Sequence, residues 1–201
     1  MTTTRTRAVL VALTATAALA LTACGSGDDT TNGAPAATSS PATATAGAHN
    51  AQDVSFAQGM IPHHQQALEM AQLAADRASS AQVKDLAARI EKAQDPEINT
   101  MTGWLKAWGE DVPMAGMDHS GHAGMAGMMS DKDMTALKKA QGADFDTMFL
   151  TMMVQHHRGA VEMAGTEKSK GDYAPATSMA DAIVTAQNAE IKEMNKLLGK
   201  G

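Results

Sequence analysis

Residues 60–71 read Met-Ile-Pro-His-His-Gln-Gln-Ala-Leu-Glu-Met-Ala, and residues 153–164 read Met-Val-Gln-His-His-Arg-Gly-Ala-Val-Glu-Met-Ala. The second stretch follows the first at a distance of 93 residues. The same register continues into the segments that follow, where Ile90, Gln94, Glu97, Ile98 and Met101 match Ile183, Gln187, Glu190, Ile191 and Met194. So many identities in one gapless register indicate an internal duplication.

The spacing within each repeat predicts helices. Phe56, Met60, His63, Ala67 and Met70 follow steps of three and four residues, which place them on one face of a helix. The segment around residues 90–104 has the same period. We therefore expect helices over about 53–78, 80–108, 131–168 and 175–198, the third of them with a short preliminary turn. Two helical hairpins that each bury one face should pack together, which predicts an all-α four-helix bundle built from two duplicated His-His hairpins.

The composition agrees with close-packed helices. Apolar residues make up 44% of the chain but aromatic residues only 3%, whereas β-sheet cores favour aromatic and β-branched side chains. The net charge is −6, and no cluster of Lys and Arg is visible. Because binding to a phosphate backbone needs such a cluster, we expect no nucleic-acid partner.

The N-terminal segment has the features of an export signal. Arg5 and Arg7 precede an apolar run over residues 8–21, which is too short for a comfortable transmembrane helix. The run ends in Leu-Thr-Ala-Cys24-Gly, which resembles a bacterial lipobox, and Cys24 is the only cysteine. We expect residues 1–23 to be a lipoprotein signal peptide and Cys24 to carry a lipid that anchors the protein to the outer face of the cell membrane.

The remaining chain divides by composition. Residues 24–50 are rich in Ala, Thr, Ser, Gly and Pro, which predicts a flexible tether. The folded domain is expected over 51–199, with a first repeat at about 53–108 and a second at about 131–199. Between them, the linker 109–130 breaks all periodicity and is rich in Met and His.

Polar residues occupy core positions in both repeats. Because a buried polar group without a partner is unfavourable by about 1–3 kcal/mol, these residues need a structural or functional explanation. One interpretation is a hydrogen-bond network that pairs His63 with Glu97 and His156 with Glu190. The other is a metal site, and adjacent histidines on a straight helix would not easily share one ion. Its candidate ligands are Met60, His63, His64, Met70, Met153, His156, His157 and Met163, surrounded by Gln94, Glu97, Met101, Gln187, Glu190 and Met194.

The linker is the second candidate metal site. It combines thioethers and imidazoles with small residues and has no helical face to bury. Thioether and imidazole ligands suit copper(I), and imidazole with Asp118 suits copper(II). The alternative is a flexible linker or a hydrophobic clamp on the helices. The candidate ligands are Met114, Met117, His119, His122, Met125, Met128 and Met129.

The two His-His motifs, together with the pattern Gln94-x-x-Glu97-Ile98-x-x-Met101-x-x-Trp104-Leu105, resemble the bacterial family catalogued as domain of unknown function 305. The resemblance covers about residues 50–199. It implies a ferritin-like four-helix bundle that is usually exported, and it implies copper binding for some members. The chain departs from the pattern at Leu197, where a Trp is expected.

These observations predict a copper-binding lipoprotein of the cell envelope that serves copper tolerance, storage or delivery, has copper-handling protein partners and is not an enzyme. A ferritin-like di-metal oxidase is one alternative, although the chain has no Glu-x-x-His motif of the kind such sites use. The other is a structural or interaction module with a paired His-Glu core. Because histidine binds metals as the neutral imidazole, we expect copper affinity to fall below about pH 6.

Overall fold

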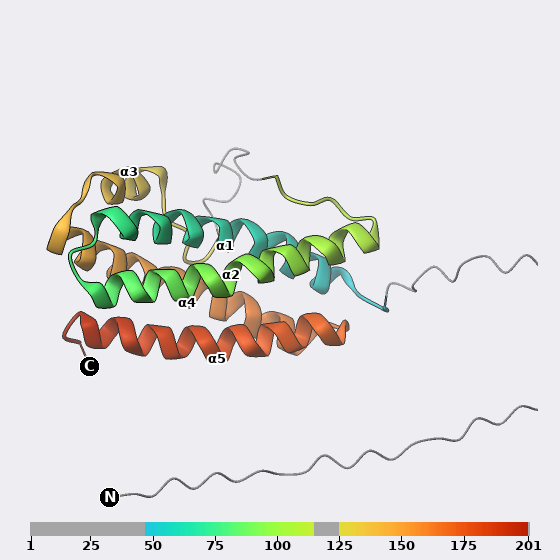
Figure 1. Ribbon diagram of the computed structural model, residues 1–201. Coiled ribbons are helices and arrows are strands. Elements are labelled where there is room, and N and C mark those ends of the chain that lie inside the picture. Colours follow the sequence, from blue (N-terminus) through green and yellow to red (C-terminus); the bar gives the residue numbers. More distant parts are fainter. Residues whose placement is uncertain (1–46, 115–124, 201) are drawn as a thin grey trace, which may run out of the picture. The chain divides into compact units, whose positions relative to one another are not determined.

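The computed structural model describes residues 47–114 and 125–200 (Figure 1). The expected signal peptide, Cys24, most of the tether, and Met117, His119 and His122 lie outside these residues. The described part is all-α, as predicted. No helix in it is both long and apolar enough to span a membrane. The helices are α1 (Ala51–Arg77), α2 (Ala81–Trp108), α3 (Asp131–Lys139), α4 (Gly142–Lys170) and α5 (Ala174–Leu197).

The helices form two hairpins that pack through their first members. Helix α1 packs against α2 and helix α4 against α5, and the hairpins meet mainly where α1 contacts α4 (Figure 1). Helix α3 contacts both α1 and α4. The duplicated sequence thus corresponds to two duplicated helical hairpins.

The segment predicted as a third helix over 131–168, with a short preliminary turn, forms two separate helices. Helix α3 begins after Ser130, which forms a capping box with Asp133, and it ends at Lys139. Helix α4 starts at Gly142, whose φ of 60° lies in the left-handed region that glycine adopts readily. The short helix separates the linker from the second hairpin and rests on α1 and α4.

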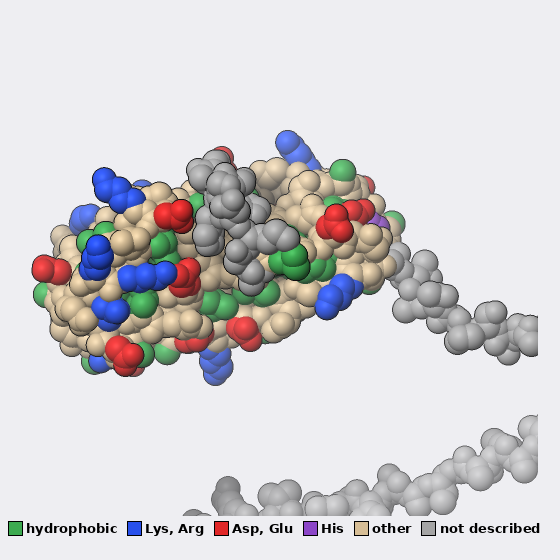
Figure 2. Space-filling view, turned by 90° about the horizontal axis from the view of Figure 1, so that it is seen from above, with side chains coloured by type: hydrophobic (Ala, Val, Ile, Leu, Met, Phe, Trp, Pro, Cys, Tyr) green, Lys and Arg blue, Asp and Glu red, His purple; other side chains and the backbone are tan. Residues whose placement is uncertain are grey.

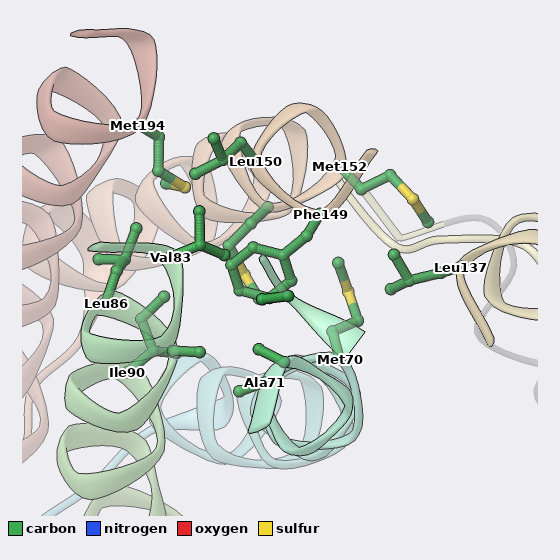
Figure 3. Close-up of a cluster of buried hydrophobic side chains, with 14 of the residues drawn as sticks. Met70, Ala71, Val83, Leu86, Ile90, Leu137, Phe149, Leu150, Met152 and Met194 are labelled. Carbon is green, nitrogen blue, oxygen red and sulfur yellow. The ribbon is translucent and has the colours of Figure 1, made fainter. Parts of the chain in front are cut away.

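Apolar side chains form two separate clusters along the helices. One contains residues 67–90 of α1 and α2, parts of α3, residues 145–154 of α4, and Met194. In Figure 3 the ring of Phe149 lies at its centre, between Met70 and Val83. The other contains residues 56–61, 101–105, 160–164 and 176–183. The sequence between these clusters on each long helix carries polar core residues, so a polar layer divides the apolar core.

Two buried aspartates connect the hairpins reciprocally. Asp146 of α4 accepts hydrogen bonds from the backbone of Ser79 and Ser80, in the turn between α1 and α2. Its repeat equivalent, Asp53 of α1, accepts hydrogen bonds from the backbone of Asp172 and Tyr173, in the turn between α4 and α5. Each hairpin therefore caps the turn of the other, which fixes how far along α4 the helix α1 can lie.

The Asp53 end contains an additional acid. Glu167 is fully buried beside Asp53, whereas its repeat equivalent is Ala74. Burial raises the pKa of Glu167 to about 7, and the nearby Asp53 carboxylate adds to this. Burial alone would raise the pKa of Asp53 too, but hydrogen bonds from backbone N–H groups and Glu167 bring it below its ordinary value. The proton of this pair therefore lies on Glu167, beside the ionised carboxylate of Asp53.

This pair should make stability depend on pH. The folded pKa of Glu167 lies above its ordinary value of 4.5, so the folded state binds more protons than the unfolded state between about pH 4.5 and 7. The stabilisation of the folded state by protonated Glu167 is fully present below that pH range and is lost as the pH rises through 7. We expect the unfolding free energy to fall by roughly 1–3 kcal/mol between pH 5 and 8 in urea titrations.

The Glu167→Gln variant should remove this dependence, because its amide can still donate to Asp53 and does not ionise. Glu162→Gln, an exposed position on the same helix, is the control and should keep the wild-type slope. Equal slopes in wild type and Glu167→Gln would contradict the assignment.

Candidate metal centre

The centre of the polar layer is a pair of histidines at the α1–α4 contact. The rings of His63 and His156, which occupy equivalent positions in the two repeats, face each other with their centroids 3.8 Å apart and their planes at 41°. They are 0% and 1% exposed. None of their four ring nitrogens has a hydrogen-bond partner. The interface thus encloses two imidazoles whose polar atoms are unused.

The neighbouring histidines point into their own hairpins. His64 Nε2 lies 2.7 Å from Glu97 Oε2 of α2, and His157 Nε2 lies 2.7 Å from Glu190 Oε2 of α5. Because an ionised carboxylate only accepts, each Nε2 carries the proton and donates it. Each Nδ1 then has a free lone pair, and both Nδ1 atoms are buried without a partner.

The expected pairing of His63 with Glu97 and His156 with Glu190 was therefore wrong by one residue. Consecutive side chains on a helix diverge by about 100°. His63 faces the other hairpin, and His64 faces its own second helix. The periodic stripe identified the buried face correctly, but it could not tell which of two adjacent buried histidines reaches the glutamate.

The chemistry of the layer fits a metal better than a closed hydrogen-bond network. Histidines that bind metals commonly donate their other ring N–H to a carboxylate, as His64 and His157 do. Six buried ring nitrogens across the four histidines remain unpaired. In the described residues, however, no three His, Cys, Asp or Glu side chains already converge on one point. Metal binding would thus require rotation of these rings or ligands of another kind.

The remaining residues predicted to surround the ligands lie in the same region or flank it. Gln94 and Gln187 are buried in the layer, and each has an unpaired Oε1. Met101 and Met194 are fully buried in opposite apolar clusters. Glu97 and Glu190 are partly exposed at the edge of the layer.

The helical methionines border the layer on both sides. Met60 belongs to one apolar cluster and Met70 and Met153 to the other, and all three are fully buried. Met163 is partly buried against the cluster of Met60. Ordinary packing accounts for these positions. Met60 and Met153 each lie three residues before a central histidine and so share its helix face, which makes their flexible thioethers candidates for additional ligands.

The linker residues separate into two groups in the described structure. Met114 is 63% exposed at the start of the linker. The last linker residues instead lie on α1 and α4, where the amide of Gln66 pairs with both the N–H and the carbonyl of Met129. Met125, Met128 and Met129 are thus held against the helices that carry His63 and His156.

Burial keeps the central imidazoles neutral. It lowers the pKa of His63 to about 3, with a further lowering by His64 and a smaller opposing effect of the Ala126 carbonyl. Burial likewise places the pKa of His156 well below its ordinary value, and His63 and His157 add to this. Both rings therefore have lone pairs ready for a metal ion at neutral pH.

Residues 53–198 match the family described as domain of unknown function DUF305. The chain belongs to the DUF305 family. No curated protein matches the chain significantly.

Solved structures of DUF305 proteins share the fold. One from Streptomyces coelicolor is 32% identical over 74% of this chain and 93% of its own, with a TM-score of 0.67. A DUF305 fragment from Deinococcus radiodurans is 30% identical over 76% of this chain and 98% of its own, with a TM-score of 0.68.

CopM is a further structural relative, and it has been solved with bound copper or silver as well as in the apo form. In its Cu(II)-bound form CopM is 36% identical to this chain over 72% of it and 94% of CopM, with a TM-score of 0.63. The Cu(I)-bound form is 34% identical over the same shares, with a TM-score of 0.60. A relative that is similar to this DUF305 chain over 72% of its length has thus been solved with bound copper.

The lowered pKa of His63 changes the expected pH dependence of binding. Protons compete for an imidazole lone pair only near or below its pKa, so an ion held by His63 should not be displaced at pH 6. We expect copper(I) retained at pH 7 to remain after dialysis at pH 5, as measured by elemental analysis, with circular dichroism confirming that the protein is folded. Loss of half the copper at pH 6 would indicate imidazoles of ordinary pKa outside the buried layer.

Proposed function

We propose that this protein is a cell-envelope copper-binding lipoprotein that stores or delivers copper and catalyses no reaction. The observation that carries the proposal is the buried layer of four histidines with six unpaired ring nitrogens. A protein core that only needed stability would gain by replacing these groups with apolar side chains, because unpaired buried polar atoms are unfavourable. Copper binding by CopM supports the choice of metal.

In this proposal the domain is a ferritin-like four-helix bundle with the ion at its centre. His63, His64, His156 and His157 supply imidazoles, and Met60, Met70, Met153 and Met163 are the nearby thioethers. Glu97 and Glu190 orient His64 and His157 by accepting hydrogen bonds from their Nε2–H groups. Neutral imidazole and thioether ligands together favour copper(I) over harder ions such as magnesium and calcium.

The location outside the cytoplasm rests on the lipobox around Cys24, and it is supported by a Streptomyces coelicolor relative described as a candidate secreted protein. Lipidation would hold the domain at the membrane surface, where partners that handle copper could exchange the ion. The face shown in Figure 2 has Lys and Arg interspersed with Asp and Glu among its described residues, which suits a soluble surface in contact with water.

The test is a competition titration of the purified full chain with copper(I), copper(II), zinc and iron(II), followed by elemental analysis after desalting. We expect retention of copper and little zinc or iron. The His63→Ala/His156→Ala variant should lose the core copper(I), whereas His49→Ala should retain it, because His49 stacks on Trp108 away from the layer. Retention of no metal would overturn the proposal, and a bound iron pair would favour the oxidase.

The glutamates offer a second and milder test. Glu97→Gln/Glu190→Gln keeps an oxygen that can accept from each histidine but removes both charges. Loss of such outer partners typically weakens metal binding about 10–100-fold, and we expect copper(I) affinity to fall by that amount. Glu193→Gln is the matched control, because Glu193 pairs with Arg89 at the surface of α5. Unchanged copper(I) affinity in the double variant would remove the glutamates from the centre.

A further inference from the structure

The last residues of the linker form a strap across the helices of the histidine layer. We define the strap as residues 125–129. It turns on a hydrogen bond from Met128 N–H to the Met125 carbonyl and on Gly127, whose φ is 83°. Its far end is held at Met129, where the Gln66 amide donates to the carbonyl at 2.9 Å and accepts from the N–H at 2.7 Å.

The strap lies directly on the backbone of α4. A Cβ on Gly159 would overlap the carbonyl of Ala126 and lie 2.8 Å from the Cα of Gly127. A Cβ on Gly127 would lie 2.9 Å from the carbonyl oxygen of His156. Only glycines at both positions allow this approach, and the strap therefore passes one helical turn from His156.

The two repeats have diverged to accommodate the strap. The residue of the first repeat equivalent to Gly159 is Gln66, the residue that binds Met129. Gln66 in the first repeat thus forms hydrogen bonds with the strap, and Gly159 in the second repeat leaves room for it. Such complementary divergence at equivalent positions indicates that the strap's seat is a built feature of the fold.

The strap places one thioether beside Gly59, where a second thioether from α4 also lies. The Sδ atoms of Met125 and Met163 lie 3.8 Å and 3.7 Å from the position that a Cβ on Gly59 would occupy. Gly59 precedes His63 by four residues, and Met163 follows His156 by seven, so both positions share the helix faces of the central histidines.

We propose that Met125 and Met163 form a separate two-thioether site for a soft monovalent cation, copper(I) or silver(I), between the strap and the histidine layer. Thioethers are soft ligands that select copper(I), and the flexible side chains can close on an ion from their present positions. The site rests on the proposed function, because an ion bound here would lie next to the copper centre. It adds a ligand pair that only the strap can complete.

Silver(I), which mimics copper(I) without redox chemistry, is the probe for the full chain purified in detergent. Its binding can be followed by the methionine methyl resonances and by equilibrium competition. We expect the Met125 and Met163 methyl signals to shift together. Met125→Leu or Met163→Leu should weaken one silver equivalent at least tenfold and leave the ion that depends on His63 and His156. The control is Met152→Leu, the same substitution at a methionine of α4 that occupies the repeat position of Gly59 and is not part of the proposed site. It should leave the binding of both ions unchanged.

A second pair of variants separates ligand loss from strap position. Gly159→Ala retains both sulfurs but forces the strap off α4, so it should weaken the same silver equivalent as Met125→Leu. Gly165→Ala is its control, because a Cβ there meets nothing within 4 Å.

The outcomes distinguish this site from the copper centre. The thioether site alone would be overturned if Met125→Leu and Met163→Leu bound silver as tightly as the wild type, the Met125 methyl signal did not shift, and the histidine-dependent ion was still bound. Absence of any silver or copper(I) binding to the wild-type chain would overturn both the site and the proposed function.

Discussion

The contact between His63 and His156 is the constraint on which the rest of the structure depends. It places two neutral imidazoles, with no hydrogen-bond partners, at the contact between α1 and α4. The apolar clusters on either side must supply the burial that holds this layer in place, because the layer itself opposes folding. A core arranged in this way holds the histidines in place at its centre. A ligand that pairs with the unsatisfied nitrogens would gain binding free energy from them.

Hairpin packing follows from reciprocal contacts made at equivalent positions. Asp53 and Asp146 each cap the turn of the opposite hairpin, so neither hairpin can slide without leaving a buried carboxylate unpaired. Where the repeats differ, the difference has a local purpose. Glu167 in place of Ala74 introduces a proton at one end, and Gly159 in place of Gln66 makes room for the strap. The duplicated hairpins form the common fold, and the positions at which the repeats differ add the buried acid and the space for the strap.

Much of this could be predicted from the sequence, because periodicity and repetition are local signals. They identified the helices, the hairpins, the family and the buried face with its histidines and glutamines. They did not identify which histidine meets Glu97, since adjacent helical positions differ only in direction. The preliminary turn before the third helix was expected, but not that it would be a separate helix ending before Gly142, because a single glycine is a weak signal within a helical pattern. The pairing of Glu167 with Asp53, and of Met125 with Met163, joins residues about 114 and 38 positions apart, and spacing carries no information on such contacts.

The equivalence of His63 and His156 also has a consequence for how such a centre could be assembled. A single hairpin with this sequence would present half of the layer, and a second copy related by a two-fold axis would place each histidine against its own counterpart. Such a homodimer would lose its centre on dilution, because the two halves would separate. Joining them in one polypeptide makes the encounter intramolecular and fixes a high effective concentration of one half for the other. The covalent fusion would therefore keep the centre intact at any protein concentration.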